Sequence, residues 1–326
     1  MKTVLVTGGA GYIGSHAVVE LLDQGYHVIV IDSLENGFLD VIDSRCKFYQ
    51  GNLQDLPFLE QIFQENSIDC VMHFAAYIKI PESINNPNKY YSNNVYSTLC
   101  LLKIMQKYQV NKIIFSSTAA VYGEIQENRK VTEDFPTNPI NPYGKSKLMA
   151  EEIIQDHAKV SPLCYAIFRY FNVAGAHEKY EIGQMDTEST ALIPKLLQSY
   201  FHPEIPFSIF GTDYNTPDGT AIRDYIHVVD LVKAHIMAIP FLEKKQSGIF
   251  NLGSEKGYSV LFVFNTFLEI IQGKMAYQIQ EKRVGDPSQV VASSQKASQL
   301  LGWKARYSLK EILESAFLWN QKNEKK

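Results

Sequence analysis

The chain has 326 residues, of which 45% are hydrophobic and 20% charged, and 31 basic against 35 acidic side chains give a formal charge of −4. This composition excludes the disordered, collagen-like and disulfide-rich classes. The mild negative charge, without a long run of like charges, argues against a nucleic-acid or membrane-surface protein. At roughly 150 residues per domain, the length predicts two domains or one large α/β unit.

The apolar runs and the cysteines predict a cytoplasmic protein. The first apolar run is too short for a secretory signal. No run of 18 apolar residues could cross a membrane. The cysteines, Cys46, Cys70, Cys100 and Cys164, lie far apart without a Cys-x-x-Cys spacing, so we expect reduced thiols. The histidines show no metal-ligand spacing, so we predict no metal site.

The first half of the chain alternates strands with helices. Runs rich in Val, Ile and Phe predict buried parallel strands at Thr3–Thr7, His27–Asp32, Cys46–Gln50, Cys70–Phe74, Lys112–Ser117 and Cys164–Tyr170. Helical patterns lie between them, near residues 12–24, 55–65, 88–109 and 143–159. This alternation implies βαβ units and an α/β fold with a Rossmann-type, doubly wound parallel sheet.

The second half is less regular and predicts a smaller, mixed α/β domain. Helical patterns lie near residues 188–200, 228–243, 259–271, 294–301 and 308–321, and short strands are expected at Phe207–Phe210 and Gly248–Leu252. Prolines and glycines from Pro203 to Gly219 indicate loop. We therefore expect a sheet domain at residues 1–175 and a substrate domain at 176–326. The boundary is soft, because later segments are expected to return to the first domain.

A glycine-rich turn between the first strand and the first helix predicts a dinucleotide site. Glycines at 8, 11 and 14 let the backbone turn tightly and approach a pyrophosphate, which the helix N-terminus then binds. The second strand ends in Asp32, 18 residues after Gly14 and close to the spacing of about 20 expected for a ribose carboxylate. Because a carboxylate there repels a 2′-phosphate, residues 1–175 are predicted to bind NAD rather than NADP.

The Gly-x-x-Gly-x-x-Gly spacing resembles that of the extended short-chain dehydrogenase/reductases, which directs attention to a tyrosine and a lysine one helical turn apart. Tyr143 and Lys147 have this spacing, on one face of a predicted helix. The lysine ammonium favours the phenolate and should lower the phenol pKa from about 10. Tyr143 can then take a proton from a sugar hydroxyl, with Thr118, at the end of the fifth strand, as a relay. Tyr108 and Lys112 share the spacing, but straddle a helix end and a strand start.

With these residues placed, the sequence resembles the UDP-glucose 4-epimerase family over almost the whole chain. The matching stretches are Val6–His16, Tyr90–Val95, Ser116–Thr118, Pro142–Lys147, Arg169–Ala176, Pro217–Thr220, Arg223–Val228, Arg283–Pro287 and Leu301–Trp303. The resemblance implies an enzyme that interconverts UDP-galactose and UDP-glucose with NAD bound throughout. Tyr143 would remove the 4-hydroxyl proton while C4 gives a hydride to NAD, and the 4-keto sugar would turn over before the hydride returns. It also implies a homodimer, packed through the helices near 88–109 and 143–159.

The resemblance extends the predicted site beyond the catalytic residues Thr118, Tyr143 and Lys147. The cofactor-binding set is Gly8, Gly11, Tyr12, Ile13, Gly14, Asp32, Asn52, Leu53, Phe74, Ala75, Asn93, Ser116, Tyr143, Lys147 and Tyr170. The substrate-binding set is Thr118, Tyr143, Asn172, Leu192, Phe210, Arg223, Tyr225, Arg283, Asp286 and Val290. By the same resemblance, Arg223 and Arg283 would clamp the diphosphate. Asn172 would donate to a phosphate or sugar oxygen, and Asp286 would hold the uridine ribose.

Several positions depart from the family pattern. Asn52 stands where relatives often have Asp, Ile78 where many have lysine and Pro81 where many have glycine; Ala191 stands where Asn or His is common. Val290 occupies a position where a large tyrosine excludes N-acetylated sugars, so acceptance of UDP-N-acetylhexosamines is an alternative hypothesis.

Other functions stay open on the sequence alone. A UDP-pentose or UDP-uronate epimerase is one alternative, and an NAD-sensing protein without chemistry is another. A sugar-nucleotide 4,6-dehydratase is disfavoured, because Ala119 and Ala120 fill the positions where that reaction needs an acid–base pair.

Overall fold

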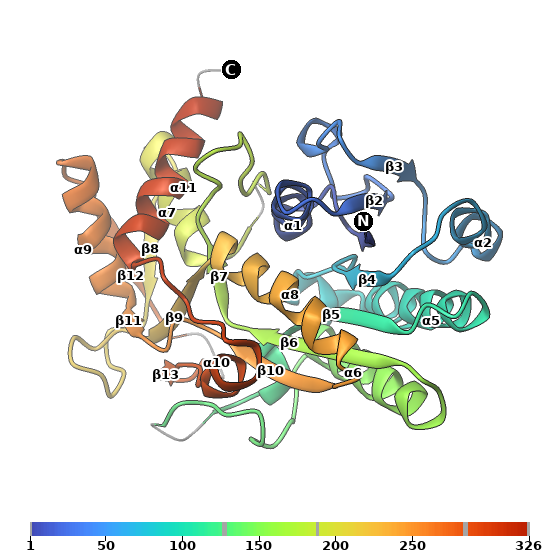
Figure 1. Ribbon diagram of the computed structural model, residues 1–326. Helices are drawn as coiled ribbons and strands as arrows, with labels where there is room; N and C mark the ends of the chain where they lie inside the picture. The colour runs from blue at the N-terminus through green and yellow to red at the C-terminus, as the bar shows by residue number, and fades with distance from the viewer. Residues whose placement is uncertain (1, 126–128, 187–188, 283–285, 325–326) are drawn as a thin grey trace.

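The computed structural model describes residues 2–125, 129–186, 189–282 and 286–324, and its centre is a seven-stranded sheet (Figure 1). In spatial order the strands are β10 (Gly248–Leu252), β6 (Cys164–Tyr170), β5 (Lys112–Thr118), β4 (Cys70–His73), β1 (Thr3–Thr7), β2 (His27–Asp32) and β3 (Lys47–Gln50). All neighbouring pairs are parallel. The chain runs outward from β1 to β3 and then crosses to β4, on the other side of β1. The predicted α/β fold with a doubly wound sheet is confirmed.

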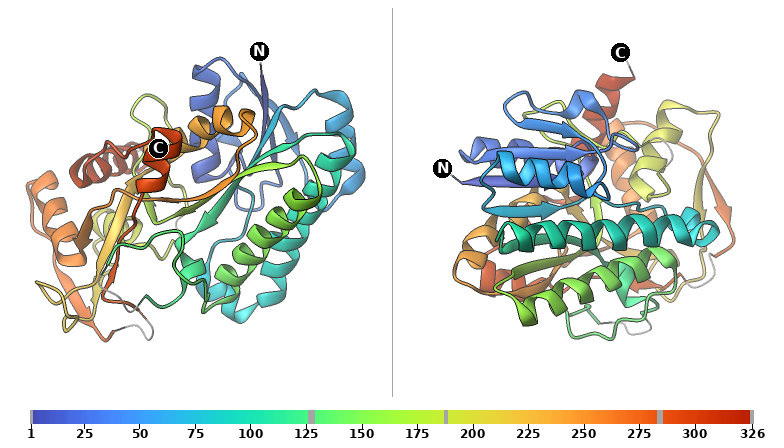
Figure 2. Two further views of the ribbon diagram at one scale, coloured as in Figure 1. Left: turned by 60° about the horizontal axis from the view of Figure 1, so that its bottom comes forward. Right: turned by 90° about the vertical axis from the view of Figure 1, so that its right-hand side faces the viewer.

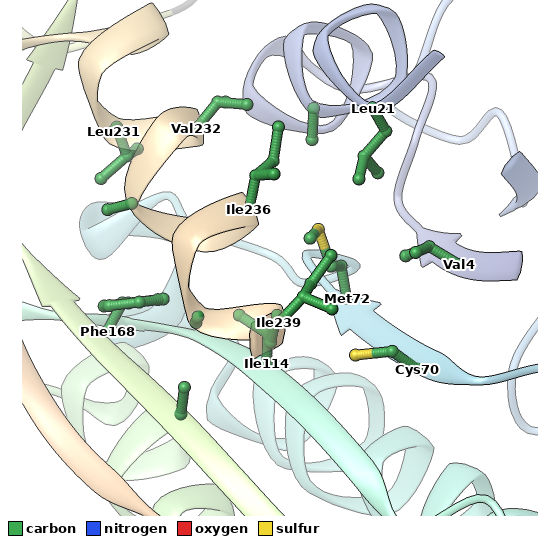
Figure 3. Close-up of a cluster of buried hydrophobic side chains, with 14 of the residues drawn as sticks. Val4, Leu21, Cys70, Met72, Ile114, Phe168, Leu231, Val232, Ile236 and Ile239 are labelled. Atoms are coloured by element: carbon green, nitrogen blue, oxygen red, sulfur yellow. The ribbon is translucent and has the colours of Figure 1, made fainter. Parts of the chain in front are cut away.

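Helices cover both faces of this sheet. On one face lie α1 (Tyr12–Asp23) and α8 (Val228–Glu243), which pack against each other and, with α10 (Gln295–Leu301), enclose an apolar cluster (Figures 1 and 3). In Figure 3, Ile239 of α8 lies beside the strand residue Ile114, and Ile236 points toward α1. On the other face lie α2 (Leu56–Glu65), α5 (Ser97–Lys107) and α6 (Pro142–Val160) (Figure 2, right). Because the strands are buried on both faces, they appear in the sequence as continuous apolar runs.

The segment predicted as one helix near 88–109 has a break in its hydrogen-bond pattern. It is built from α4 (Pro87–Tyr90), a π-helical stretch η2 (Tyr91–Tyr96) and α5, and is preceded by α3 (Ile80–Asn85). A further short helix, η1, spans Leu39–Val41, and η3 spans Ala119–Tyr122 directly after β5. The π-helical stretch packs against α6, and its Asn94 side chain donates to the hydroxyl of Ser146, which lies between the predicted catalytic residues Tyr143 and Lys147 in the sequence.

A smaller unit is built around β9 (Ile222–His227), which pairs with β11 (Gly257–Ser259), β13 (Gln289–Val290) and β7 (Asn172–Ala174). A second small sheet joins β8 (Phe207–Phe210) to β12 (Tyr277–Gln280). The helices α7 (Leu192–Phe201), α9 (Val260–Ile271) and α11 (Leu309–Asn323) share its apolar core. The sequence analysis did not predict β9, because Arg223 and Asp224 interrupt the apolar run by which a buried strand is recognised.

Two elements that follow residue 175 are part of the large sheet and its helical cover. β10 pairs in parallel with β6, and α8 covers the face shared with α1. The boundary at residue 175 stays a prediction. Within the described residues, no helix is long and apolar enough to span a membrane.

Candidate active site

The glycine turn between β1 and α1 has the shape of a cradle for a pyrophosphate. Gly8 adopts a φ of +72°, and a Cβ atom there would lie 2.6 Å from the amide nitrogen of Ala75. At Gly14 a Cβ atom would lie 2.1 Å from the carbonyl oxygen of Gly8. The N-cap of α1 is Gly11, so the cap residue has no side chain to satisfy the first N–H groups of the helix. These donors and the helix dipole fit the anionic centre of NAD.

Asp32 ends β2 beside this turn, and its carboxylate is held in place by two amides. The N–H groups of Ala10 and Leu34 each donate to it over 2.9 Å. Burial raises the carboxyl pKa, while these two hydrogen bonds oppose the rise. A carboxylate fixed here can still accept hydrogen bonds from a ribose hydroxyl on its remaining lone pairs. The position therefore fits the ribose partner expected from the sequence.

The other predicted cofactor residues follow strands at the same edge of the sheet. Asn52 and Leu53 follow β3, and the Asn52 side chain accepts from the amide of Gln54 rather than reaching outward. Phe74 and Ala75 follow β4, and the Phe74 ring packs 4.9 Å from that of His235. Two hydroxyls, those of Ser116 on β5 and Tyr170 on β6, form a hydrogen bond with each other. Asn93 lies in η2 and donates to Asn94 over 3.1 Å. The carboxyl ends of parallel strands are where doubly wound sheets bind ligands.

Tyr143 and Lys147 lie in the first two turns of α6, which begins at Pro142 behind the N-cap Asn141. The Asn141 side chain accepts from the amide of Gly144 over 2.8 Å. Lys147 is buried, and its ammonium donates to the carbonyl oxygen of Ser116 over 2.8 Å. Burial lowers the Lys147 pKa to about 7, while the carboxylate of Glu151 opposes the change. The lysine is therefore held against the end of β5.

The Tyr143 phenol does not show the low pKa that the sequence predicts. Burial raises its pKa to about 12, opposed by a hydrogen bond with the Thr118 side chain. The reason is geometric: Lys147 directs its charge at the carbonyl of Ser116, and desolvation dominates at Tyr143. A positive charge brought to this pocket would lower the phenol pKa.

Thr118 and Tyr143 nevertheless meet as expected. Thr118 is the last residue of β5, and its hydroxyl also accepts from the amide of Ala120 over 3.1 Å, which caps η3. The ring of Tyr90 lies edge-on to that of Tyr143, with 6.5 Å between centroids. The Tyr143 phenol thus lies between the Thr118 side chain and the ring of Tyr90.

Two predicted substrate residues pair with each other. The Arg223 guanidinium on β9 forms an ion pair with the carboxylate of Asp286, and also donates to the backbone oxygen of Ile222 over 2.8 Å. Val290 pairs in register with Arg223 and packs, partly buried, against the apolar cluster that includes Phe171. Arg223 retains further N–H groups, so the pair can accept an anionic ligand without leaving a buried charge unpaired.

The remaining substrate residues are spread around β7, β8 and α7. The Asn172 side chain donates to the backbone oxygen of Asp224 over 2.9 Å, and Tyr225 is its buried register partner on β9. Leu192 opens α7, and Phe210 ends β8. Arg283 lies outside the described residues.

The structure also reveals two polar links that the sequence analysis missed. Glu151, one turn after Lys147, is fully buried and forms an ion pair with Arg169 of β6 at 2.6 Å. The buried side chain of Asn94 joins the amide and carbonyl of Tyr77 to the hydroxyl of Ser146. A glutamate at i+4 from the lysine was a visible signal, whereas no sequence spacing relates Asn94 to Ser146.

In the part of the chain that the structure describes, no cluster of three or more His, Cys, Asp or Glu side chains could hold a metal ion. The arrangement can move a proton at Tyr143 and bind a dinucleotide beside it.

Comparison with known proteins identifies the family. The sequence profile of the NAD dependent epimerase/dehydratase family matches residues 4–253. The UDP-glucose 4-epimerase of Lactobacillus helveticus is 44% identical over 99% of this chain and 98% of its own length. A crystal structure of UDP-glucose 4-epimerase superimposes with a TM-score of 0.96 at 46% identity, covering 98% of both chains. That of the Bifidobacterium longum enzyme, in complex with NAD+ and UDP, gives 0.92 at 41% identity, covering 99% of both chains. The chain therefore belongs to the NAD-dependent epimerase/dehydratase family and, within it, to the UDP-glucose 4-epimerases.

Proposed function

We propose that the chain catalyses NAD-dependent epimerisation at C4 of a UDP-hexose, interconverting UDP-galactose and UDP-glucose, with Tyr143 as proton acceptor and donor. The observation that carries the assignment of roles is the position of Tyr143 in α6 close enough to Thr118, the last residue of β5, for the Thr118 side chain to lower the phenol pKa. The alternatives of N-acetylhexosamine, pentose and uronate substrates are not favoured.

The residues of the chain handle the proton. The 4-hydroxyl of the sugar gives its proton to the Tyr143 oxygen, with the Thr118 hydroxyl bridging the two oxygens. NAD, when bound, supplies reversible hydride acceptance at C4. After the 4-keto sugar has presented its other face, Tyr143 returns the proton to the same oxygen. Lys147, when its amine is protonated, brings a positive charge to the end of β5, and turning this charge from the Ser116 carbonyl toward Tyr143 would favour the phenolate.

The nucleotide half of the substrate lies, in this proposal, along β9 and β13. Arg223 binds a diphosphate oxygen while it stays paired with Asp286, whose second oxygen accepts from the uridine ribose. Asn172 on β7 lies beside Tyr225 and contributes an amide donor. Arg283 is a predicted second clamp, outside the described residues.

The experiment that tests the reaction uses the purified chain and UDP-galactose, first without added NAD. Formation of UDP-glucose is expected, because the cofactor is retained between turnovers. Tyr143→Phe should lower kcat roughly 10²- to 10⁴-fold, the range of general acid–base catalysis, while bound NAD is unchanged. Tyr108→Phe is the matched control, since Tyr108 shares the spacing to a lysine but closes α5. Full turnover by the Tyr143→Phe variant would contradict the assignment.

Two further features, the oligomeric state and the cell compartment, complete the proposal. The chain forms a homodimer through α5 and α6, which run side by side across one face (Figure 2, right). This is supported by the exposed apolar side chains of Tyr96, Leu99 and Met149 on the helical layer. The protein acts in the cytoplasm, which fits its four cysteines being free thiols.

A further inference from the structure

Two loops on opposite sides of the glycine turn touch each other. β2 and β4 are both neighbours of β1, one on each side. Glu35 follows β2, and Tyr77 follows β4; the Tyr77 phenol donates a hydrogen bond to the Glu35 carboxylate. Lys89 of α4 adds its ammonium 3.9 Å from the same carboxylate and 4.3 Å from the centre of the Tyr77 ring. The three residues form a cluster that joins the two loops.

Both loops also contact the turn itself, so the cluster joins two segments that lie on either side of it. On one side, the amide of Phe38 donates to the carbonyl of Ala10 over 3.0 Å. On the other, the backbone of Ala75 lies so close to Gly8 that a Cβ atom there would be 2.6 Å away. A bridge from Glu35 to Tyr77 therefore spans the stretch from Gly8 to Ala10, where α1 presents its amides to the pyrophosphate.

The side of the cluster that follows β4 is rigidly held. The amide and carbonyl of Tyr77 are both bonded to the Asn94 side chain, at 2.9 and 3.0 Å. Lys89 is bound by Glu82 at 2.8 Å, and Glu82 also accepts from the hydroxyl of Tyr90 over 2.9 Å. In the loop after β2, in contrast, Glu35 and its neighbour Asn36 are exposed. Opening therefore requires the exposed Glu35 end of the cluster to move while the Tyr77 end stays in place.

We propose that Glu35, Tyr77 and Lys89 form a clasp over the dinucleotide, which must open before NAD can leave and which slows its release. The inference rests on the proposed function, since it concerns the cofactor of that site. A carboxylate at Glu35 would share the sign of charge of the phosphates of a bound dinucleotide, so attraction to NAD does not explain its position. Glu35 instead holds the loop after β2 to Tyr77, and the ammonium of Lys89 offsets the negative charge of Glu35.

The test measures how fast bound NAD exchanges. The holoenzyme is loaded with radiolabelled NAD, an excess of unlabelled NAD is added, and the label retained on the protein is followed over time. Tyr77→Phe and Glu35→Gln should each release NAD roughly three- to tenfold faster, because a partly exposed hydrogen bond to a charged group is modest in strength. The double variant should release NAD little faster than either single one, because both changes weaken the same contact, Tyr77→Phe by removing the donor and Glu35→Gln by removing the charge of the acceptor.

A matched control exists on β3, the outermost strand beside β2. Tyr49 donates to Glu65 over 2.7 Å, and Lys47, which opens β3 at its amino end, lies 4.9 Å from the Tyr49 ring. This cluster has the same chemistry and is away from the glycine turn. Tyr49→Phe and Glu65→Gln should leave the rate of NAD release unchanged.

The outcomes separate the clasp from the proposed function. Faster release in both clasp variants, with normal kcat while NAD is bound, supports the clasp. Unchanged release in Tyr77→Phe, or slower release in Glu35→Gln as simple charge repulsion would give, overturns it even when the enzyme turns over UDP-galactose. Absence of turnover in the NAD-loaded wild type would instead overturn the proposed function.

Discussion

Burial lowers the pKa of Lys147 into the neutral pH range. The folded pKa of about 7 lies far below the ordinary value of 10.5, because the ammonium is desolvated beneath the end of β5. Between these two values the unfolded chain binds more protons than the folded chain does. The free energy of unfolding therefore rises with pH from about 7 to about 10, as far as this residue is concerned.

Lys147→Met should remove that slope and the catalytic charge together. The methionine fills similar space without a charge, so the free energy of unfolding should depend less on pH between 7 and 10 than in the wild type. The kcat should fall roughly 100-fold or more, because the phenolate of Tyr143 loses its cation. Urea unfolding at pH 7 and pH 9, together with turnover of UDP-galactose, measures both effects. An unchanged slope would show that Lys147 is not the group that titrates.

At the scale of elements, the β1–α1 turn depends on the absence of side chains. A Cβ atom at Gly14 would collide with the Gly8 carbonyl oxygen at 2.1 Å, and the collision is with backbone that cannot rotate away. We expect Gly14→Ala to cost about 1–3 kcal/mol of stability, as overpacking does, and to deplete the NAD that copurifies. Bound NAD is measured by absorbance after denaturation. Gly273→Ala is the control, because its nearest neighbour would be 3.5 Å away.

The elements also show how far the sequence could predict this fold. The strands of the large sheet were predicted to within one residue at each end, because burial on both faces forces a continuous apolar run. β9 was missed, because the polar residue Asp224 lies in its middle. The Asp224 carboxylate can be buried there because it accepts hydrogen bonds from the amides of Glu255 and Ala292. Those partners lie 31 and 68 residues away in the sequence, so no local pattern predicts them.

Within the candidate site, too, features set by local spacing could be predicted, whereas those that depend on distant residues could not. Tyr143 and Lys147 could be predicted because their relation is a helical spacing. The pKa of Tyr143 could not, because desolvation depends on what surrounds the phenol. The pairing of Arg223 with Asp286 was equally hidden, because those residues are 63 positions apart in the sequence.

At the scale of the whole molecule, α5 and α6 form an outer layer with apolar side chains on its surface. Leu99 on α5 is 38% exposed and Met149 on α6 is 43% exposed. If this face is the dimer interface, Leu99→Asp or Met149→Asp should shift the protein to the monomer mass in size-exclusion chromatography with light scattering. Leu318→Asp is the control, since Leu318 is equally apolar and exposed on α11. A monomeric wild type would contradict the proposed dimer.

The position of β10 has a consequence for how the chain reaches its native state. β10 closes the large sheet beside β6, and α8 covers the cluster that contains Phe168 and Ile114, yet both come after residue 175. A nascent chain that has emerged only to residue 175 would present the whole edge of β6 and one apolar face of the sheet to water. The last strand of the large sheet can pair only after residue 252 has been synthesised, so residues 1–175 alone do not complete this sheet.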